Sequence, residues 1–214
     1  YNLYNADGFQ IELKSGEINI LSRYYYRFLQ EYGPDLVINC AGHVGTDFCE
    51  ANPFYASHIN EAGVYYLVEN INRYNENERY GMEKAKLIHF STTAIFDPVH
   101  YTTMGSIRET SLVGPQTIYG ISKLGGELVV KSYCPESLRL IIRPCFIYGK
   151  NEQHSVISKM ASWALEDSHS RIPKDISSTN FERDILLDPE YYKDYLFVDD
   201  FIDLMKLIIF SDDK

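Results

Sequence analysis

Short apolar segments alternate along the chain with longer segments whose apolar residues have helical spacing. The apolar runs are residues 1–6, 36–39, 85–90 and 138–142, and the helical spacing covers residues 21–32, 53–74 and 117–133. Strands that are apolar throughout and separated by helices indicate a parallel sheet covered on both faces. We therefore predict an α/β fold built on a doubly wound parallel sheet.

Small and polar residues directly follow each predicted strand. Asp7 follows the first strand, residues 39–42 close the second, residues 91–93 follow the third, and residues 143–146 follow the fourth. In parallel sheets ligands bind beyond the carboxyl ends of the strands, which meet at one edge. The sequence thus predicts one ligand site built from these four segments.

Tyr119 and Lys123 stand four residues apart in the run Y-G-I-S-K of the last predicted helix. This spacing puts the phenol and the ammonium on one helix face, where the positive charge lowers the pKa of the phenol and makes it a better acid/base. The hydroxyl of Thr92, in the run F-S-T-T, can share the same substrate oxygen. Such Tyr/Lys pairs also occur as ordinary solvated helix faces, so the assignment depends on the surrounding motifs.

Composition narrows the class of protein. With 214 residues and 45% hydrophobic content, the chain can bury one substantial core, or one core plus part of a smaller lobe. We expect neither a membrane span nor a signal peptide, because the chain lacks a long apolar run and its first residues lack a basic region, and we expect a cytoplasmic protein. The formal net charge of −10 disfavours a nucleic-acid partner.

The cysteines and histidines show no ligand spacing. Four cysteines lack C-x-x-C spacing, and six histidines lack H-x-H or H-x-x-x-H spacing. We therefore expect reduced thiols and no metal site. His43 differs in position, because it directly follows the small-residue end of the second strand and is a candidate for substrate contact.

Six motifs, in this order, resemble those of the extended short-chain dehydrogenases/reductases, which act on nucleotide sugars and include NAD-dependent epimerases/dehydratases and dTDP-4-dehydrorhamnose reductases. They are D-L-V-I-N-C-A-G at residues 35–42, I-N-E-A-G at 59–63, F-S-T-T at 90–93, Y-G-I-S-K-L-G-G-E at 119–127, R-P-C-F-I-Y-G at 143–149 and K-D-Y-L-F-V-D-D-F at 193–201. The resemblance implies a Rossmann-like fold, NAD or NADP as cofactor and a nucleotide sugar as substrate. It leaves the oligomeric state open, with a homodimer as one option.

The resemblance also implies roles for individual residues. Tyr119 matches the residue that exchanges a proton with the sugar, Thr92 the one that orients the sugar oxygen, and Lys123 the one that lowers the Tyr pKa and holds the nicotinamide ribose. At the cofactor it places Asp7 on the adenosine ribose, Glu17 and Ile18 beside the adenine, Cys40, Ala41 and Gly42 where backbone approaches closely, Asn60 as structural support, and Ser91, Tyr119, Lys123 and Pro144. The substrate candidates are His43, Thr93, Phe146 and Lys193.

The chain departs from this family at its start. None of its 13 glycines forms the Gly-rich turn that seats the pyrophosphate at a helix N-terminus. We interpret the chain as lacking the first strand-turn-helix unit and the end of the substrate lobe, either by truncation or by evolutionary loss. Residues 1–150 are then a cofactor-binding domain without its first βα unit, and residues 151–214 part of a substrate-binding lobe.

The sequence leaves the reaction open. Thr93 and Ala94 follow Thr92 where dehydratases carry Asp-Glu, so a dehydratase is disfavoured. Phe146 and the run T-D-F-C-E-A-N-P resemble the reductases, whereas the Lys193 motif resembles the epimerases. The alternative is a catalytically silent relative that serves as a regulatory or nucleotide-sensing subunit, although retention of the Thr, Tyr and Lys set argues against it.

Overall fold

The computed structural model describes residues 25–77, 84–99, 106–150 and 194–210, together with the backbone of residues 2–4 and 10–12. The chain divides into two compact units, Tyr1–Pro144 and Cys145–Lys214. The sequence placed this division after residue 150, so the strand that follows Pro144 belongs here to the second unit.

The first unit is built on a parallel sheet of three strands in the order β3-β4-β5. Strand β4 (Lys86–Phe90) lies between β3 (Leu36–Asn39) and β5 (Arg139–Ile142), and both neighbours run parallel to it. All three strands fall where the apolar runs predicted them. Their registers bring Asn39 opposite His89, and His89 opposite Ile141.

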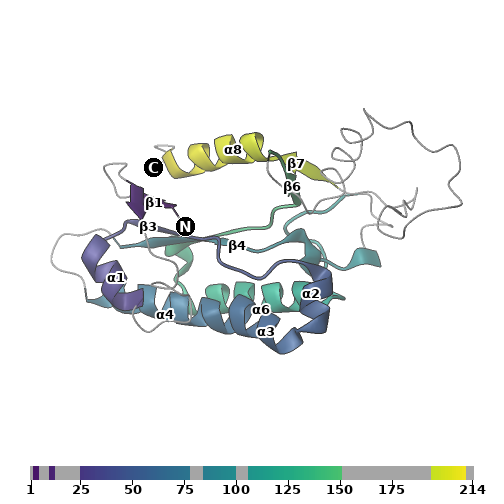
Figure 1. Cartoon of the computed structure of the whole chain (residues 1–214), viewed down its shortest axis with the longest axis horizontal. Helices are drawn as coiled ribbons and strands as arrows, with labels where there is room; N and C mark the ends of the chain where they lie inside the picture. Colours follow the sequence, from purple (N-terminus) through teal and green to yellow (C-terminus); the bar gives the residue numbers. More distant parts are fainter. Residues whose placement is uncertain are drawn as a thin grey trace, which may run out of the picture. The chain divides into compact units, whose positions relative to one another are not determined.

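Helices α1 (Tyr25–Tyr32), α4 (Gly63–Glu76) and α6 (Ile118–Tyr133) lie along one face of this sheet (Figure 1). The predicted helix over residues 53–74 is present in three consecutive pieces: α3 (Pro53–Ser57), a π-helical turn (His58–Ala62) and α4. The sequence predicted neither this π-helical turn nor the short helix α2 (Thr46–Ala51) before it. Short 3-10 turns at Thr93–Ile95 and Glu136–Leu138 follow β4 and precede β5.

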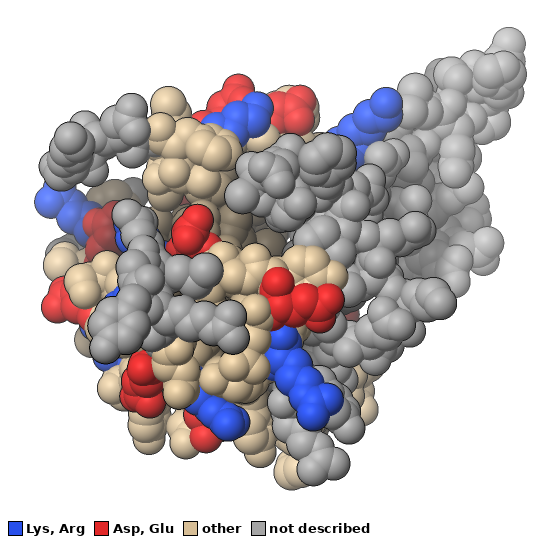
Figure 2. All heavy atoms as spheres, turned by 90° about the vertical axis from the view of Figure 1, so that its left-hand side faces the viewer, with Lys and Arg blue, Asp and Glu red and all other residues tan. Residues whose placement is uncertain are grey.

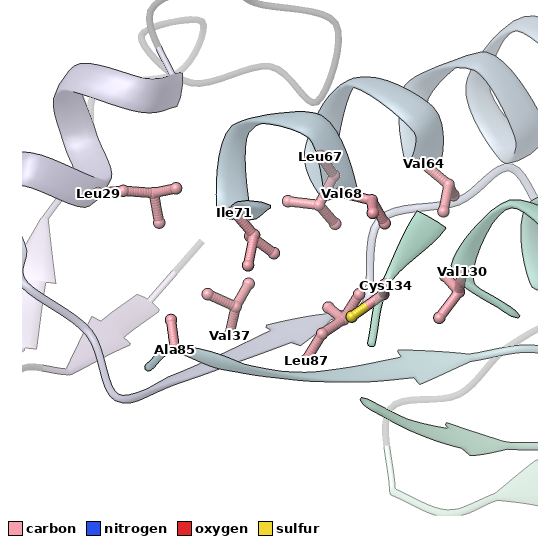
Figure 3. Close-up of a cluster of buried hydrophobic side chains, with 10 residues drawn as sticks. All are labelled: Leu29, Val37, Val64, Leu67, Val68, Ile71, Ala85, Leu87, Val130 and Cys134. Atoms are coloured by element: carbon pink, nitrogen blue, oxygen red, sulfur yellow. The ribbon is translucent and has the colours of Figure 1, made fainter. Parts of the chain in front are cut away.

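A hydrophobic core fills the space between the sheet and these helices (Figure 3). Its buried members are Leu29, Val37, Val64, Leu67, Val68, Ile71, Ala85, Leu87, Val130 and Cys134. Strand residues alternate between the two faces of a sheet, so Ile38 points away from Val37 and the helices. Ile38 and Leu140 are 41% and 39% exposed. An apolar residue in these strands therefore indicates burial more reliably on the face that the helices cover than on the opposite face.

Strand β1 (Asn2–Tyr4) differs from the sequence prediction. It pairs antiparallel with β2 (Gln10–Glu12) in a sheet of two strands, whereas the sequence placed the first strand in the parallel sheet. The sequence between them contains Asp7-Gly8, a dipeptide typical of tight hairpin turns. A local hairpin is the simplest partner for so short a strand.

The second unit contains a parallel pair of strands and one helix. Strand β6 (Phe146–Tyr148) pairs with β7 (Tyr195–Phe197), which leads directly into α8 (Val198–Phe210). Among the described helices, none is both long and apolar enough to cross a membrane. Figure 2 shows one face of the molecule, where the basic and acidic side chains of the described residues are interspersed.

Candidate active site

The carboxyl ends of β3, β4 and β5 meet at one edge of the sheet because the three strands are parallel. The residues that follow them are 40–42, 91–93 and 143–144. Two backbone hydrogen bonds join the last two segments, from Ser91 to Ile142 at 2.7 Å and from Thr93 to Pro144 at 3.2 Å. The expected meeting of these segments at one edge is thus confirmed for the first unit.

Thr92 and Tyr119 meet at this edge. Although the two residues lie on different elements, the Thr92 hydroxyl is near enough to the Tyr119 phenol to lower its pKa. Thr92 follows β4 and caps the 3-10 turn, where its Oγ1 accepts a hydrogen bond from Ala94 N at 3.2 Å. Tyr119 is the second residue of α6. The two hydroxyls are therefore close enough to bind one oxygen atom of a ligand.

The pKa of Tyr119 differs from the sequence expectation. Burial raises the pKa of the phenol above its ordinary value, and the nearby Thr92 hydroxyl offsets this only in part. We had expected the ammonium of Lys123 to lower the pKa. In the structure that ammonium is directed to a backbone carbonyl, so desolvation of the phenolate dominates.

Lys123 is buried, with 6% of its surface exposed. Its Nζ donates a hydrogen bond to the carbonyl oxygen of Phe90, the last residue of β4, at 2.5 Å. Burial lowers the pKa of Lys123 to about 8, and the thiol of Cys40 opposes this shift. A Cβ atom at Gly42 would lie 3.5 Å from Nζ. The strand end that carries Cys40 and Gly42 therefore borders the Lys123 amine.

Asn60 holds the loop after β3 in place. Its Oδ1 accepts a hydrogen bond from His43 N at 2.7 Å, and its Nδ2 donates to His43 O and to Ser122 Oγ, both at 2.9 Å. Asn60 lies in the π-helical turn, a backbone form often found at functional sites. Because both of its amide hydrogens bind protein atoms, Asn60 supports the site rather than presenting a donor to a ligand.

Glycines let α6 approach its neighbours closely. A Cβ atom at Gly126 would overlap the backbone carbonyl oxygen of Asn60, and one at Gly120 would overlap that of Ala94. A Cβ at the adjacent Gly125 would instead lie 2.9 Å from the carboxylate end of Glu61, an exposed side chain that can move. In the Y-G-I-S-K-L-G-G-E motif, Gly120 and Gly126 thus permit close packing of α6 against backbone atoms, whereas Gly125 faces only a side chain that can move.

Gly126→Ala is expected to destabilise the protein by roughly 1–3 kcal/mol, because the added methyl forces α6 away from a backbone atom that cannot yield. Gly125→Ala in the same helix is the matched control, and we expect it to be neutral or to stabilise by up to about 1 kcal/mol through helix propensity. Urea unfolding of both variants measures the difference. Equal stability of the two would contradict the close approach at Gly126.

Glu127 and Arg143 form a buried ion pair that the sequence analysis missed. Glu127 is fully buried and accepts hydrogen bonds from Arg143 Nε at 3.0 Å and from Arg143 Nη2, and Lys131 Nζ lies 2.6 Å from its Oε1. Burial alone would raise the pKa of Glu127, but these bonds hold it at about 2. The pair ties α6 to the end of β5. Its sequence signal is a charged residue on the apolar side of the helix, four positions after Lys123.

His89 is a second buried polar residue beneath the site. Asn39 Oδ1 accepts from Ala41 N at 3.0 Å, which directs Asn39 Nδ2 to His89 Nδ1, also at 3.0 Å. His89 Nδ1 is therefore the acceptor, and the proton resides on Nε2. Burial, followed by the charge of Lys123, lowers the pKa of His89 to about 3. A neutral imidazole thus supports the strand end at Ala41.

We expect His89 to make stability fall in mild acid. Between pH 6 and 5 the unfolded chain binds a proton on this imidazole and the folded chain does not, so unfolding becomes easier as the pH falls. In His89→Phe the slope of unfolding free energy against pH should decrease by about 1 kcal/mol per pH unit. Denaturant unfolding between pH 6 and pH 5 measures this slope. The window lies above the pH range in which Glu127 titrates in the folded protein. Parallel slopes for both proteins would refute a neutral His89.

His43 is placed beside aromatic side chains. Its ring centroid lies 3.9 Å from that of Phe48 and 5.4 Å from that of Tyr55, both in edge-on geometry. Phe146, the other aromatic substrate candidate, belongs to the second unit, where its ring lies 5.8 Å from that of Tyr195. Asp7, Glu17, Ile18 and Lys193 lie outside the described residues. Within the described ranges, no three His, Cys, Asp or Glu side chains gather as metal ligands.

Comparison with known proteins identifies the family. Residues 12–178 match the family described as RmlD substrate binding domain. The chain belongs to this family. A relative is the dTDP-4-dehydrorhamnose reductase of Aggregatibacter actinomycetemcomitans, which is 27% identical over 141 residues, 65% of this chain and 43% of the relative. The RmlD-family chain therefore spans less than half of the length of that relative.

Solved structures resemble the RmlD-family chain in fold. The dTDP-4-dehydrorhamnose reductase of Bacillus anthracis in complex with NADP has a TM-score of 0.61 at 24% identity, covering 76% of this chain and 53% of that one. The UDP-glucuronic acid 4-epimerase of Bacillus cereus in complex with UDP-glucuronic acid and NAD has a TM-score of 0.67 at 21% identity, covering 91% and 55%. These structures confirm the Rossmann-like fold class. The family match and the reductase relative confirm the resemblance to the extended short-chain dehydrogenases/reductases.

Proposed function

We propose that the protein is an NAD(P)H-dependent reductase of nucleotide-linked 4-keto sugars. The observation that carries the proposal is the proximity of the Thr92 hydroxyl and the Tyr119 phenol at the carboxyl edge of the sheet, with Lys123 one helical turn away. Membership of the RmlD family and a relative that is a dTDP-4-dehydrorhamnose reductase support the substrate class.

In this reaction Tyr119 donates a proton to the oxygen of the sugar carbonyl, and Thr92 donates a hydrogen bond to the same oxygen. The phenol of Tyr119 is protonated at neutral pH, as a proton donor must be, although burial raises its pKa and makes it a weaker acid. Lys123, with a pKa of about 8, carries a positive charge at pH 7, but its ammonium is bonded to the Phe90 carbonyl oxygen and does not lower the pKa of Tyr119 in this structure.

The residues at the strand ends fit a dinucleotide cofactor, which supplies the hydride when bound. A Cβ at Gly42 would lie 3.3 Å from Asn60 Oδ1 and 3.5 Å from Lys123 Nζ, so the absence of a side chain at Gly42 lets this strand end pack closely against both residues. Cys40, Ala41 and Gly42 would hold the cofactor on the β3 side, Ser91 and Pro144 at the other strand ends, and Lys123 at the nicotinamide ribose.

An epimerase is the second candidate. The run K-D-Y-L-F-V-D-D resembles epimerases, and the Bacillus cereus epimerase matches 91% of the chain against 76% for the Bacillus anthracis reductase. In an epimerase Tyr119 would first remove the proton of the sugar hydroxyl and later return it.

A turnover assay distinguishes the candidates. The full-length protein is incubated with NADH or NADPH and a panel of UDP-, dTDP- and GDP-linked 4-keto sugars, and in a second series with NAD or NADP and the corresponding 4-hydroxy sugars, while nicotinamide absorbance is followed. A reductase oxidises NAD(P)H in proportion to the sugar that it reduces. An epimerase interconverts 4-hydroxy sugars without net oxidation of the cofactor, and chromatography detects the new sugar. Absence of both reactions would refute the proposal and favour the regulatory subunit.

A further inference from the structure

Tyr119 occupies a vulnerable position in its helix. It is the second residue of α6, in the first turn, where backbone N–H groups lack partners four residues earlier in the helix. If this turn frays, the Tyr119 phenol moves relative to Thr92, and misplacement by about 1 Å can cost a large factor in rate. The N–H partners of the first turn therefore decide how well the phenol is held.

Thr117 supplies partners for two of these groups. Its Oγ1 accepts from Gly120 N at 3.1 Å, and its carbonyl oxygen accepts from Ile121 N at 2.9 Å. The N–H of Ile118, next to Tyr119, bonds outside the helix. Glu50 Oε1 accepts it at 2.8 Å, although Glu50 lies 68 residues earlier in the chain.

The helix that carries Glu50 also lies near the side chain of Tyr119. Glu50 and Cys49 are neighbours on α2, which packs against α6 (Figure 1). Cys49 is fully buried and lies near enough to Tyr119 to influence its phenol electrostatically. Two consecutive residues of α2 thus reach the backbone and the side chain at the start of α6. A carboxylate is also the favoured charge at a helix N-terminus.

We propose that Glu50 is a positioning residue for Tyr119: its carboxylate anchors the Ile118 N–H and thereby fixes the phenol beside Thr92. The inference rests on the proposed function of Tyr119 as proton donor. On the other side, Gly120 packs so closely on the Ala94 carbonyl that no Cβ fits between them. The first turn of α6 is held between these two contacts, of which only the Glu50 contact is made by an exposed side chain.

Glu50→Ala and Glu50→Gln test the proposal in the full-length protein, with Glu69→Ala as control because Glu69 is an exposed glutamate of α4. Amide hydrogen exchange at Ile118 should quicken roughly 2- to 30-fold in Glu50→Ala, as expected for loss of a helix cap. Turnover should fall roughly 10-fold while the cofactor Kd changes less than about twofold, because the cofactor contacts remain. Glu50→Gln retains an acceptor oxygen of the same reach and should recover most of both losses.

Two readouts separate this proposal from the proposed function. If Ile118 exchange in Glu50→Ala matches that in Glu69→Ala, the anchor does not exist. If exchange quickens but turnover stays at the Glu69→Ala level, Glu50 is structural alone and the positioning role is refuted. Should the unaltered protein reduce no sugar, the 13C resonance of the Tyr119 phenol decides instead: a shift in Glu50→Ala supports positioning, and an unchanged resonance overturns it.

Discussion

Tyr119→Phe is expected to lower turnover by about 10²–10⁴-fold, the range that general acid/base catalysis supplies. The substitution removes the proton donor but retains the aromatic ring, so the loss should fall on kcat and leave the cofactor Kd nearly unchanged. Nicotinamide absorbance measures turnover, and titration calorimetry measures cofactor binding. Activity like that of the unaltered protein would refute the mechanism.

Two further substitutions sharpen this result. Thr92→Ala should cost less turnover than Tyr119→Phe, because Thr92 orients the oxygen without transferring the main proton. Thr92→Ser is its control, since it keeps both the hydroxyl and the cap on Ala94 N. Lys123→Ala should weaken cofactor binding and also lower turnover. This double effect distinguishes Lys123, which we place at the nicotinamide ribose, from Tyr119, the proton donor.

Glu127→Ala is expected to destabilise the protein by roughly 3–5 kcal/mol, because it leaves the guanidinium of Arg143 without its carboxylate at a site where that side chain is 15% exposed. Arg143 also lies over the Phe96 ring at 5.0 Å, so its displacement disturbs the segment after Thr92. Denaturant unfolding measures the loss.

The exposed pair Lys206–Asp203 provides the control. Its side chains are 62% and 72% exposed, and solvent screening leaves such pairs little energy. Asp203→Ala should therefore change stability only slightly. If Glu127→Ala also changes stability only slightly, the buried Glu127–Arg143 pair does not stabilise the packing of α6 on β5.

The strands and helices of the first unit were predictable because burial leaves a periodic trace. Residues 36–38 are apolar throughout, and the helical spacing over residues 117–133 predicts the helix that the structure shows as α6. The pairing partner of β1 was not predictable. A strand of three residues carries too little hydrophobic pattern to show whether it pairs in the parallel sheet or with the neighbouring strand β2.

The candidate site was predictable to the extent that it follows strand ends. Thr92 and Tyr119 meet because Thr92 follows the end of β4 and Tyr119 lies in the first turn of a helix that begins at the same edge. The contacts of Glu50 and Glu127 were not predicted. Glu50 bonds to a residue 68 positions away and looks like an ordinary surface charge, and Glu127 stands out only as a charged residue on the apolar side of its helix. The direction of the Tyr119 pKa shift was wrong for a related reason: the spacing of Lys123 fixes its helix face but not where its ammonium points.

Transfer of deuterium from NAD(P)H labelled at nicotinamide C4 into a 4-keto sugar tests the central claim most directly. Mass spectrometry of the product from the full-length protein should show a single deuterium at the sugar C4, formed rapidly by the unaltered protein and about 10²–10⁴-fold more slowly by Tyr119→Phe. Product without deuterium, or equal rates for the two proteins, would contradict an account in which Tyr119 donates the proton that accompanies hydride transfer.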